Sequence, residues 1–316
     1  MSIVSPLSGS SNVSLVENIR TCDLIKLYQK LRIDISADLQ KIKKISLYHC
    51  DDSDLYFFYP CITGSEKFYE QLQKFDWYYL DDKKEYEYAS KFIKNFDLVL
   101  EAGCGKGAFA KKISSKNFVG LEFSSKASEL ANEQGLHVLN ESIELHVSNN
   151  FEKYDVVCAF QVLEHIDKIT SFIQSCLDCL KPNGLLIFSV PSFDSFSRYT
   201  PNFSLDMPPH HVTRWTDKAL NNLEQYFDVE LLEIIHEPLQ LAHRQMYLQA
   251  LLRRTLKNIF NFPIKNIDLS WRNSIISLIE SRSSVGTFNF LSWSENSFRS
   301  TSVSYTHLTL PTNREV

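Results

Sequence analysis

The sequence predicts an α/β fold built on a doubly wound, mostly parallel sheet of seven strands. Three observations predict it. Strand-like and helix-like runs alternate between residues 97 and 190, a glycine-rich turn follows the first of these strands, and an acidic residue ends the second. Such alternation is typical of βαβ units whose strands lie parallel, so we expect a Rossmann-like domain with an N-terminal extension and a C-terminal helical segment.

The strands are predicted from short apolar runs bounded by turn residues. Five of them are Asp97–Glu101, Asn117–Glu122, Leu136–Leu139, Tyr154–Phe160 and Gly184–Val190. A sixth is Asp228–Ile235, whereas no segment stands out as the seventh strand that the fold class implies. A further short strand, ended by Pro60, is expected before the domain at residues 55–59.

The helices are predicted from apolar residues at helical spacing and from capping residues. One helix is expected to begin after Asp81 or Asp82, and one after the cap Thr216. The others are expected at Ala108–Ser115, Ser124–Glu133, Ser142–Val147, Lys168–Leu180 and residues 244–260.

The bulk composition argues against several classes of protein. The 316 residues carry a net charge of −5 without a basic run, which argues against a nucleic-acid partner. No apolar run is long enough for a membrane span and the N-terminus does not resemble a signal peptide, so stable membrane insertion is not expected. Seven irregularly spaced cysteines are typical of a reducing compartment, and we expect a cytoplasmic protein.

The glycine-rich turn reads Glu101-Ala-Gly-Cys-Gly-Lys-Gly107 and is predicted to hold a nucleotide. Glycines let the backbone approach a ligand closely, and the helix that follows directs free N–H groups at a negative group. The spacing fits a dinucleotide as well as S-adenosylmethionine. Glu101 favours S-adenosylmethionine, because a carboxylate repels a pyrophosphate but attracts the ammonium of the methionine moiety. The predicted cofactor contacts here are Glu101, Gly103, Cys104, Gly105 and Gly107.

Glu122 is the second predicted anchor, because an acid at the end of the second strand can accept both ribose hydroxyls. The neighbouring Phe123 is placed to pack on the adenine face. Both ligand classes use such an acid. After the third strand, Ser142 and Ile143 are candidates for the adenine edge, although Ser142 is equally suited to cap a helix.

The segment Phe160-Gln-Val-Leu-Glu-His-Ile166 makes the pattern more specific. With Leu180–Pro191 and Pro208-Pro-His-His-Val-Thr-Arg-Trp215, it resembles class I S-adenosylmethionine-dependent methyltransferases. The branch that it resembles includes ubiquinone-biosynthesis O-methyltransferases and enzymes that act on sugars, lipids and secondary metabolites. The resemblance implies a small-molecule, glycan or lipid acceptor, methylated at oxygen, and it places Gln161 near the cofactor. The alternatives are a nicotinamide-dependent oxidoreductase and a non-catalytic nucleoside-binding relative.

Four residues are candidates for the chemistry, because methyl transfer to a hydroxyl is helped by a general base. They are Glu164, His165, His210 and His211. Each is equally suited to brace a loop. Some relatives bind a metal through an E-x-x-E-H arrangement, and because Gln161 replaces its first acid, we expect no metal site.

The domain organisation follows from these motifs. We predict an N-terminal extension at residues 1–80, whose serine-rich first 15 residues are disordered, and an S-adenosylmethionine-binding domain at 81–240. A helical segment is expected at 241–302. Residues 303–316 begin with a stretch resembling a translated sequencing adapter, and we expect them to be an artefact that replaces the natural C-terminus.

Overall fold

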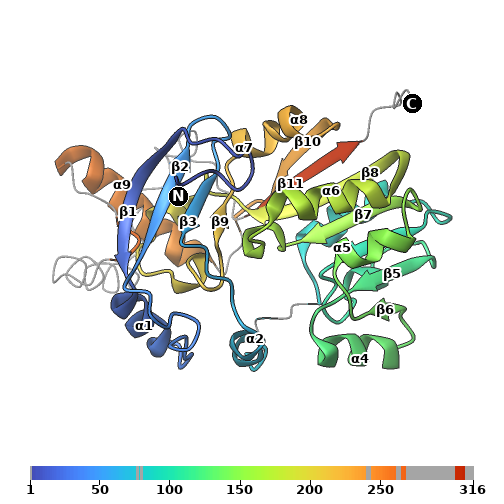
Figure 1. The fold of residues 1–316 in the computed structure, drawn as a ribbon, viewed down its shortest axis with the longest axis horizontal. Coiled ribbons are helices and arrows are strands. Elements are labelled where there is room, and N and C mark those ends of the chain that lie inside the picture. Colours follow the sequence, from blue (N-terminus) through green and yellow to red (C-terminus); the bar gives the residue numbers. More distant parts are fainter. Residues whose placement is uncertain are drawn as a thin grey trace.

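A computed structural model gives the structure of the chain and describes residues 2–75, 78, 81–239, 243–260, 265–267 and 303–309. The strands form two sheets, seen side by side in Figure 1. The smaller has the order β1-β2-β3-β9 and the larger β10-β11-β8-β7-β4-β5-β6. The larger sheet confirms the predicted doubly wound fold.

The five parallel strands of the larger sheet lie close to the predicted positions. They are β4 (Val99–Ala102), β5 (Phe118–Leu121), β6 (Val138–Leu139), β7 (Tyr154–Phe160) and β8 (Leu180–Pro191). The sixth, β10 (Glu230–His236), also lies near its prediction. Strand order runs outward in both directions from the pair β4 and β7, so ligands are expected beyond the carboxyl ends of these two strands.

The seventh strand, for which no segment stood out in the sequence, is β11 (Val303–Thr309). It lies within the segment that was expected to be an artefact. It pairs antiparallel with β8 on one side and with β10 on the other. Strand pairing uses backbone N–H and C=O groups, so segments of many different sequences could occupy the position between β8 and β10. The adapter origin of residues 303–316 stays a prediction.

Both faces of the larger sheet are buried, as expected of a parallel sheet. Leu100, Val157 and Phe188 face α6 (Ile169–Cys179) in one core cluster. Val99 and Val156 face the opposite side and pack with Tyr86 and Phe109 in another. Cys176 and Cys179 are buried free thiols within α6 and pack in the first of these clusters.

Several helices begin at the predicted caps. Ser124 caps α4 (Ser125–Glu133), Ser142 caps α5 (Ile143–His146), and Thr216 caps α7 (Asp217–Asn221), which α8 (Leu223–Tyr226) follows. In each case the hydroxyl accepts a hydrogen bond from the backbone N–H three residues later. The helix α9 (Arg244–Phe260) matches the prediction for 244–260, and the rest of the predicted helical segment lies almost wholly outside the described residues.

Two helix predictions were wrong in extent. After the glycine-rich turn only a 3-10 turn forms, at Phe109–Lys111, because the hydroxyl of Ser115 bonds the carbonyl of Asp97 and the N–H of Asn117 instead of continuing a helix. The helix expected after Asp81 or Asp82 is α3 (Lys84–Ala89), without a side-chain cap. Further 3-10 turns are Ser90–Phe92, Val147–Asn149, Leu163–His165, Phe196–Tyr199 and Ser204–Asp206.

The N-terminal extension is a folded unit with its own core. Its elements are β1 (Val13–Arg20), α1 (Thr21–Lys30), β2 (Lys44–Cys50), β3 (Tyr56–Tyr59) and α2 (Glu66–Leu72). The disorder predicted for residues 1–15 is not what the structure shows for those it describes, because the side chain of Leu7 is 3% exposed and joins the core.

The fourth strand of the smaller sheet comes from far along the chain. It is β9 (Thr213–Arg214), which pairs antiparallel with β3. Residues on both sides of the predicted boundary between 80 and 81 therefore share one sheet. Across the part of the chain that the structure describes, no helix is long and apolar enough to cross a membrane.

Candidate active site

The glycine-rich turn leaves β4 with three glycines in the left-handed region. Their φ angles are 75° at Gly103, 54° at Gly105 and 73° at Gly107. A Cβ at Gly103 would lie 2.7 Å from Cγ2 of Val162, and one at Gly107 would clash with Leu136. The turn therefore requires glycine for its conformation and for its close packing against the loop after β7. Cys104 is buried between them and packs beneath Gly120.

Glu101 lies at the end of β4 with only 1% of its surface exposed. Its Oε2 atom accepts no hydrogen bond from the residues that the structure describes. Burial raises the pKa of its carboxyl well above the ordinary value, and the charges of Glu122 and Glu85 add to this while Lys83 opposes it. An unsatisfied buried acceptor is costly, so this atom suits a cationic donor such as an ammonium group.

Glu122 connects the segments that follow β4 and β5. Its Oε2 accepts from the N–H of Gly105 and its Oε1 from the N–H of Ser124, both at 2.8 Å. Each carboxylate oxygen has a further lone pair, so the pair remains able to accept two hydroxyl groups. Asn140 was missed in the sequence, yet its amide donates to the carbonyls of Glu122 and Phe123 and holds this corner.

The other predicted cofactor residues differ in what their side chains are doing. Phe123 is 76% exposed, so its ring is available to pack on a base. The hydroxyl of Ser142 caps α5 and Ile143 is buried in the core. Gln161 has a φ of 57°, and its amide donates to the hydroxyl of Ser189 on β8 at 3.2 Å. The capping role weighed for Ser142 is the one its hydroxyl has in this structure.

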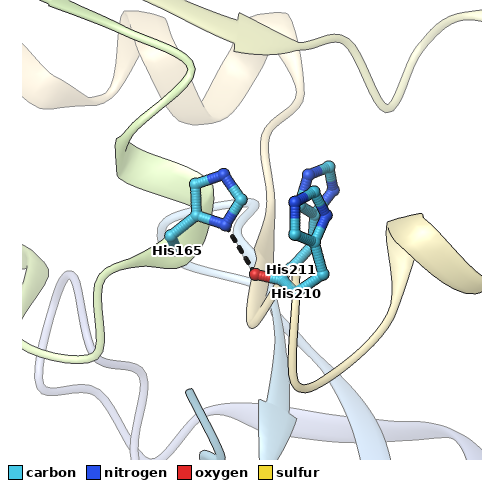
Figure 2. Close-up of side chains that lie close together, drawn as sticks. All are labelled: His165, His210 and His211. Carbon is cyan, nitrogen blue, oxygen red and sulfur yellow. Dashed lines mark hydrogen bonds between the residues drawn. The ribbon is translucent and has the colours of Figure 1, made fainter. Parts of the chain in front are cut away.

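The fold brings the four candidate catalytic residues together, although 45 positions of sequence separate His165 from His210. Glu164 and His165 lie in the 3-10 turn after β7, and His210 and His211 precede β9. Figure 2 shows the His165 ring beside the stacked rings of His210 and His211. Ring centroids are 4.6 Å apart for His165 and His210 and 5.0 Å apart for His165 and His211. We call these three residues the histidine cluster.

Backbone contacts through Val212 fix the cluster between the two sheets. The N–H of Val212 donates to the carbonyl of Glu164 at 2.8 Å, and its carbonyl accepts from the N–H of Phe58 on β3 at 3.0 Å. The hydroxyl of Thr213 donates to the carbonyl of Leu163. Hydrogen bonds thus join the segment at Val212 and Thr213 to the turn after β7 and also to β3.

The electrostatics of the cluster follow from burial. Burial lowers the pKa of His165 to about 4 and lowers the pKa values of His210 and His211 well below the ordinary range. All three rings are therefore neutral near pH 7 and have a nitrogen lone pair to offer. Burial also raises the pKa of Glu164 to about 8.

Residues missed in the sequence connect the two halves of the site. The Tyr69 ring lies 6.1 Å from that of His165, and the charges of Glu164 and Glu122 both act on its hydroxyl, whose pKa burial raises. The charges of Lys83 and Glu85 act on the pKa values of both Glu101 and Glu164. The glycine-rich turn and the histidine cluster are therefore neighbouring parts of one site. No motif marks these residues, because none of them belongs to the sequence motifs that carry the resemblance.

Comparison with known proteins gives a family match over about half of the chain. A family model described as a methyltransferase domain matches residues 72–234. The ubiquinone biosynthesis O-methyltransferase of Histophilus somni (strain 2336) is 28% identical over 149 residues, which cover 38% of this chain and 63% of that protein. The same enzyme of Serratia proteamaculans (strain 568) is 31% identical over 99 residues, covering 29% and 41%. The chain thus spans less than two thirds of the length of these relatives.

Among solved structures, one similar chain is an S-adenosylmethionine-dependent methyltransferase from Thermotoga maritima, described as a possible histamine N-methyltransferase. It is 16% identical with a TM-score of 0.46, and the match covers 71% of this chain and 86% of that one. A second, from Archaeoglobus fulgidus, is also 16% identical, with a TM-score of 0.43 and coverage of 67% and 85%.

Proposed function

Because this chain belongs to the class I S-adenosylmethionine-dependent methyltransferases, we propose that it transfers a methyl group from S-adenosylmethionine to the oxygen of a small-molecule, glycan or lipid acceptor. Family membership decides between the two nucleotide classes that the glycine-rich turn permits, in favour of S-adenosylmethionine. The observation that carries the proposal is the buried, unsatisfied Oε2 of Glu101 beside a turn that only glycine can form.

The residues at the turn suit the parts of this cofactor. Glu101 offers its carboxylate to the ammonium group, and Glu122 offers its two oxygens to the ribose hydroxyls. Phe123 presents an exposed ring to the adenine, Ser142 and Ile143 are proposed for the adenine edge, and Gln161 is proposed as a further cofactor contact. Loop backbone at Gly103, Cys104, Gly105 and Gly107 lies against the methionine moiety.

The histidine cluster and Glu164 supply the acceptor side of the reaction. Methyl transfer from a sulfonium is a displacement, in which the enzyme mainly aligns donor and acceptor. A hydroxyl acceptor must also lose its proton, and an imidazole that is neutral near pH 7 has an unprotonated ring nitrogen that can accept it. The ubiquinone biosynthesis O-methyltransferases to which the chain is similar are named for transfer to oxygen, which supports this choice of acceptor atom.

The test is binding followed by transfer. Titration calorimetry with S-adenosylmethionine and with S-adenosylhomocysteine is expected to give one site per chain. Incubation with methyl-labelled cofactor and fractionated cell extract is then expected to label a small-molecule, glycan or lipid fraction. Absence of heat with both nucleosides contradicts the proposal, and binding without label in any fraction favours a non-catalytic relative.

Replacing Glu122 by alanine is expected to weaken binding of S-adenosylmethionine and of its demethylated product alike. Charge-assisted hydrogen bonds to the ribose contribute about 1.5–3 kcal/mol, so the dissociation constants should rise by about 10- to 100-fold. Calorimetry measures this directly. Glu129→Ala, which removes an exposed acid from the same neighbourhood on α4, is the matched control and should leave both constants unchanged.

A further inference from the structure

The histidine cluster has the arrangement of a metal-binding site as well as that of a base. One ring nitrogen from each of His165, His210 and His211 lies within 4.8 Å of the corresponding nitrogens of the other two. A tetrahedral ion with bonds of about 2.1 Å separates its ligand nitrogens by about 3.4 Å. Each nitrogen therefore has to move by less than about 1 Å to share an ion. Figure 2 shows the three rings next to one another.

The hydrogen bonds of the three rings fix which nitrogen is left for an ion. Nδ1 of His165 lies 2.6 Å from the carbonyl oxygen of His210, and Nδ1 of His210 lies 2.8 Å from that of Leu205. A carbonyl only accepts, so both Nδ1 atoms carry the proton. Nδ1 of His211 lies 3.2 Å from Oδ1 of Asp206, whose other oxygen pairs with Arg214 and which therefore also accepts.

All three histidines consequently present an unprotonated Nε2, held by a partner at Nδ1. Metal-ligating histidines have this same construction, in which a carbonyl or carboxylate behind the ring sets the tautomer and the ring orientation. Nε2 of His210 is buried and has no hydrogen-bond partner among the described residues. A buried nitrogen without a hydrogen-bond partner lacks the contact that would balance its desolvation.

Glu164 offers a carboxylate beside the histidine cluster, although it is not one of the residues whose ligand atoms all lie within 4.8 Å of one another. It is 1% exposed, its Oε1 lies 3.8 Å from Nε2 of His165, and neither carboxylate oxygen accepts a hydrogen bond from a neighbouring side chain that the structure describes. A carboxylate in such surroundings is stabilised by a cation that it touches directly.

We propose that His165, His210 and His211 bind one divalent transition-metal ion through Nε2, with Glu164 as the carboxylate ligand. Three imidazoles and a carboxylate suit borderline ions such as Zn²⁺, Co²⁺ or Fe²⁺ better than Mg²⁺ or Ca²⁺, which prefer oxygen. The sequence expectation of no metal depended on Gln161, but the donor set found here does not use that position. On the proposed function, a bound ion would occupy the imidazole nitrogens named above as the base, and it would instead promote loss of the acceptor proton as a Lewis acid.

The test uses the untagged full chain after dialysis against a chelator, and its readout is metal binding without cofactor or acceptor. Titration with Zn²⁺ in a calorimeter is expected to give one site per chain. Titration with Co²⁺ is expected to give visible absorption bands of a site with nitrogen ligands. Unfolding temperature should rise with Zn²⁺, because the ion binds the folded state. A folded wild-type chain that binds neither ion stoichiometrically overturns the proposal.

Variants then assign the ligands. His165→Gln and His211→Gln are each expected to weaken Zn²⁺ binding by at least about 10-fold, and Glu164→Gln to shift the Co²⁺ bands. His137→Gln, at an exposed histidine elsewhere, is the matched control and should bind as wild type does. Unchanged binding in a folded ligand variant also overturns the assignment. Since S-adenosylmethionine binding is measured separately, failure of this site and failure of the proposed function are distinguished.

Discussion

Glu101→Gln is expected to weaken binding of S-adenosylmethionine by about 10- to 100-fold while making the cofactor-free protein more stable. The first effect follows from loss of the negative charge that, in the proposed function, faces the ammonium group. The second follows because the wild-type carboxylate is 1% exposed with one oxygen unsatisfied, and a neutral amide of the same shape is easier to bury. The free energy of unfolding should rise by about 1–3 kcal/mol at pH 8.

The stability gain should depend on pH with a defined sign. Burial raises the folded-state pKa of Glu101 above its ordinary value of 4.5, so the folded state binds this proton more tightly than the unfolded state. Its contribution to stability is fully present below the ordinary value of 4.5, and it is lost as pH rises from there through the raised folded-state pKa. Glutamine does not titrate, so the advantage of the variant should grow with pH.

Urea unfolding at pH 5 and pH 8 and calorimetric titration with cofactor measure the two effects. Glu129→Gln is the control for both, because that residue is exposed on α4. If Glu101→Gln loses stability and keeps cofactor affinity, then the carboxylate is a structural group and the assignment to the ammonium is wrong. The variant is expected to bind cofactor more weakly and yet to unfold less readily, a combination that general damage to the fold would not produce.

Arg214→Met should produce the largest loss of stability, about 3–5 kcal/mol in the free energy of unfolding. Arg214 is 4% exposed in its side chain, and its Nη2 lies 2.9 Å from Oδ2 of Asp206. Its Nε and Nη2 also donate to the backbone carbonyl of Asp206. Methionine would leave the buried Asp206 carboxylate without its cation, and the desolvation of that charge would no longer be offset.

A double variant separates loss of the ion pair from loss of packing. Arg214→Met with Asp206→Leu removes both charges, and it should recover part of the lost stability because no unpaired carboxylate remains. Arg20→Met is the matched control, since the Arg20–Asp23 pair is at the surface, and its urea midpoint should stay unchanged. A loss in Arg214→Met no larger than that of the control would show that the pair is dispensable.

The position of the glycine-rich turn beside Glu122 was predictable because its signals are local. A glycine-rich turn after a strand and an acid after the next strand lie within 22 residues, and the order of parallel strands brings their ends together. Capping serines and a threonine before α4, α5 and α7 likewise act within one turn of helix. Five of the strands needed only short apolar runs.

The remaining features depend on contacts between distant segments. Asn140 holds Glu122 through backbone carbonyls, and Tyr69 from the N-terminal extension reaches His165, and neither contact has a local pattern. The seventh strand, Val303–Thr309, pairs with β8 more than 110 positions earlier in the chain. The three histidines were individually singled out, but the hydrogen bonds that fix their tautomers come from backbone folding that spacing does not reveal.

The two-residue strand β9 determines how far upstream a fragment with a supported histidine cluster has to begin. It follows His211 within two positions, and its only neighbour in the smaller sheet is β3, which lies upstream of residue 72, where the family match begins. A fragment trimmed to residues 72–234 would keep all three histidines and Glu164, yet it would lack the strand against which His210 and His211 are anchored. The N-terminal sheet therefore supports the segment that carries His210 and His211, and a fragment that keeps this support has to include β3.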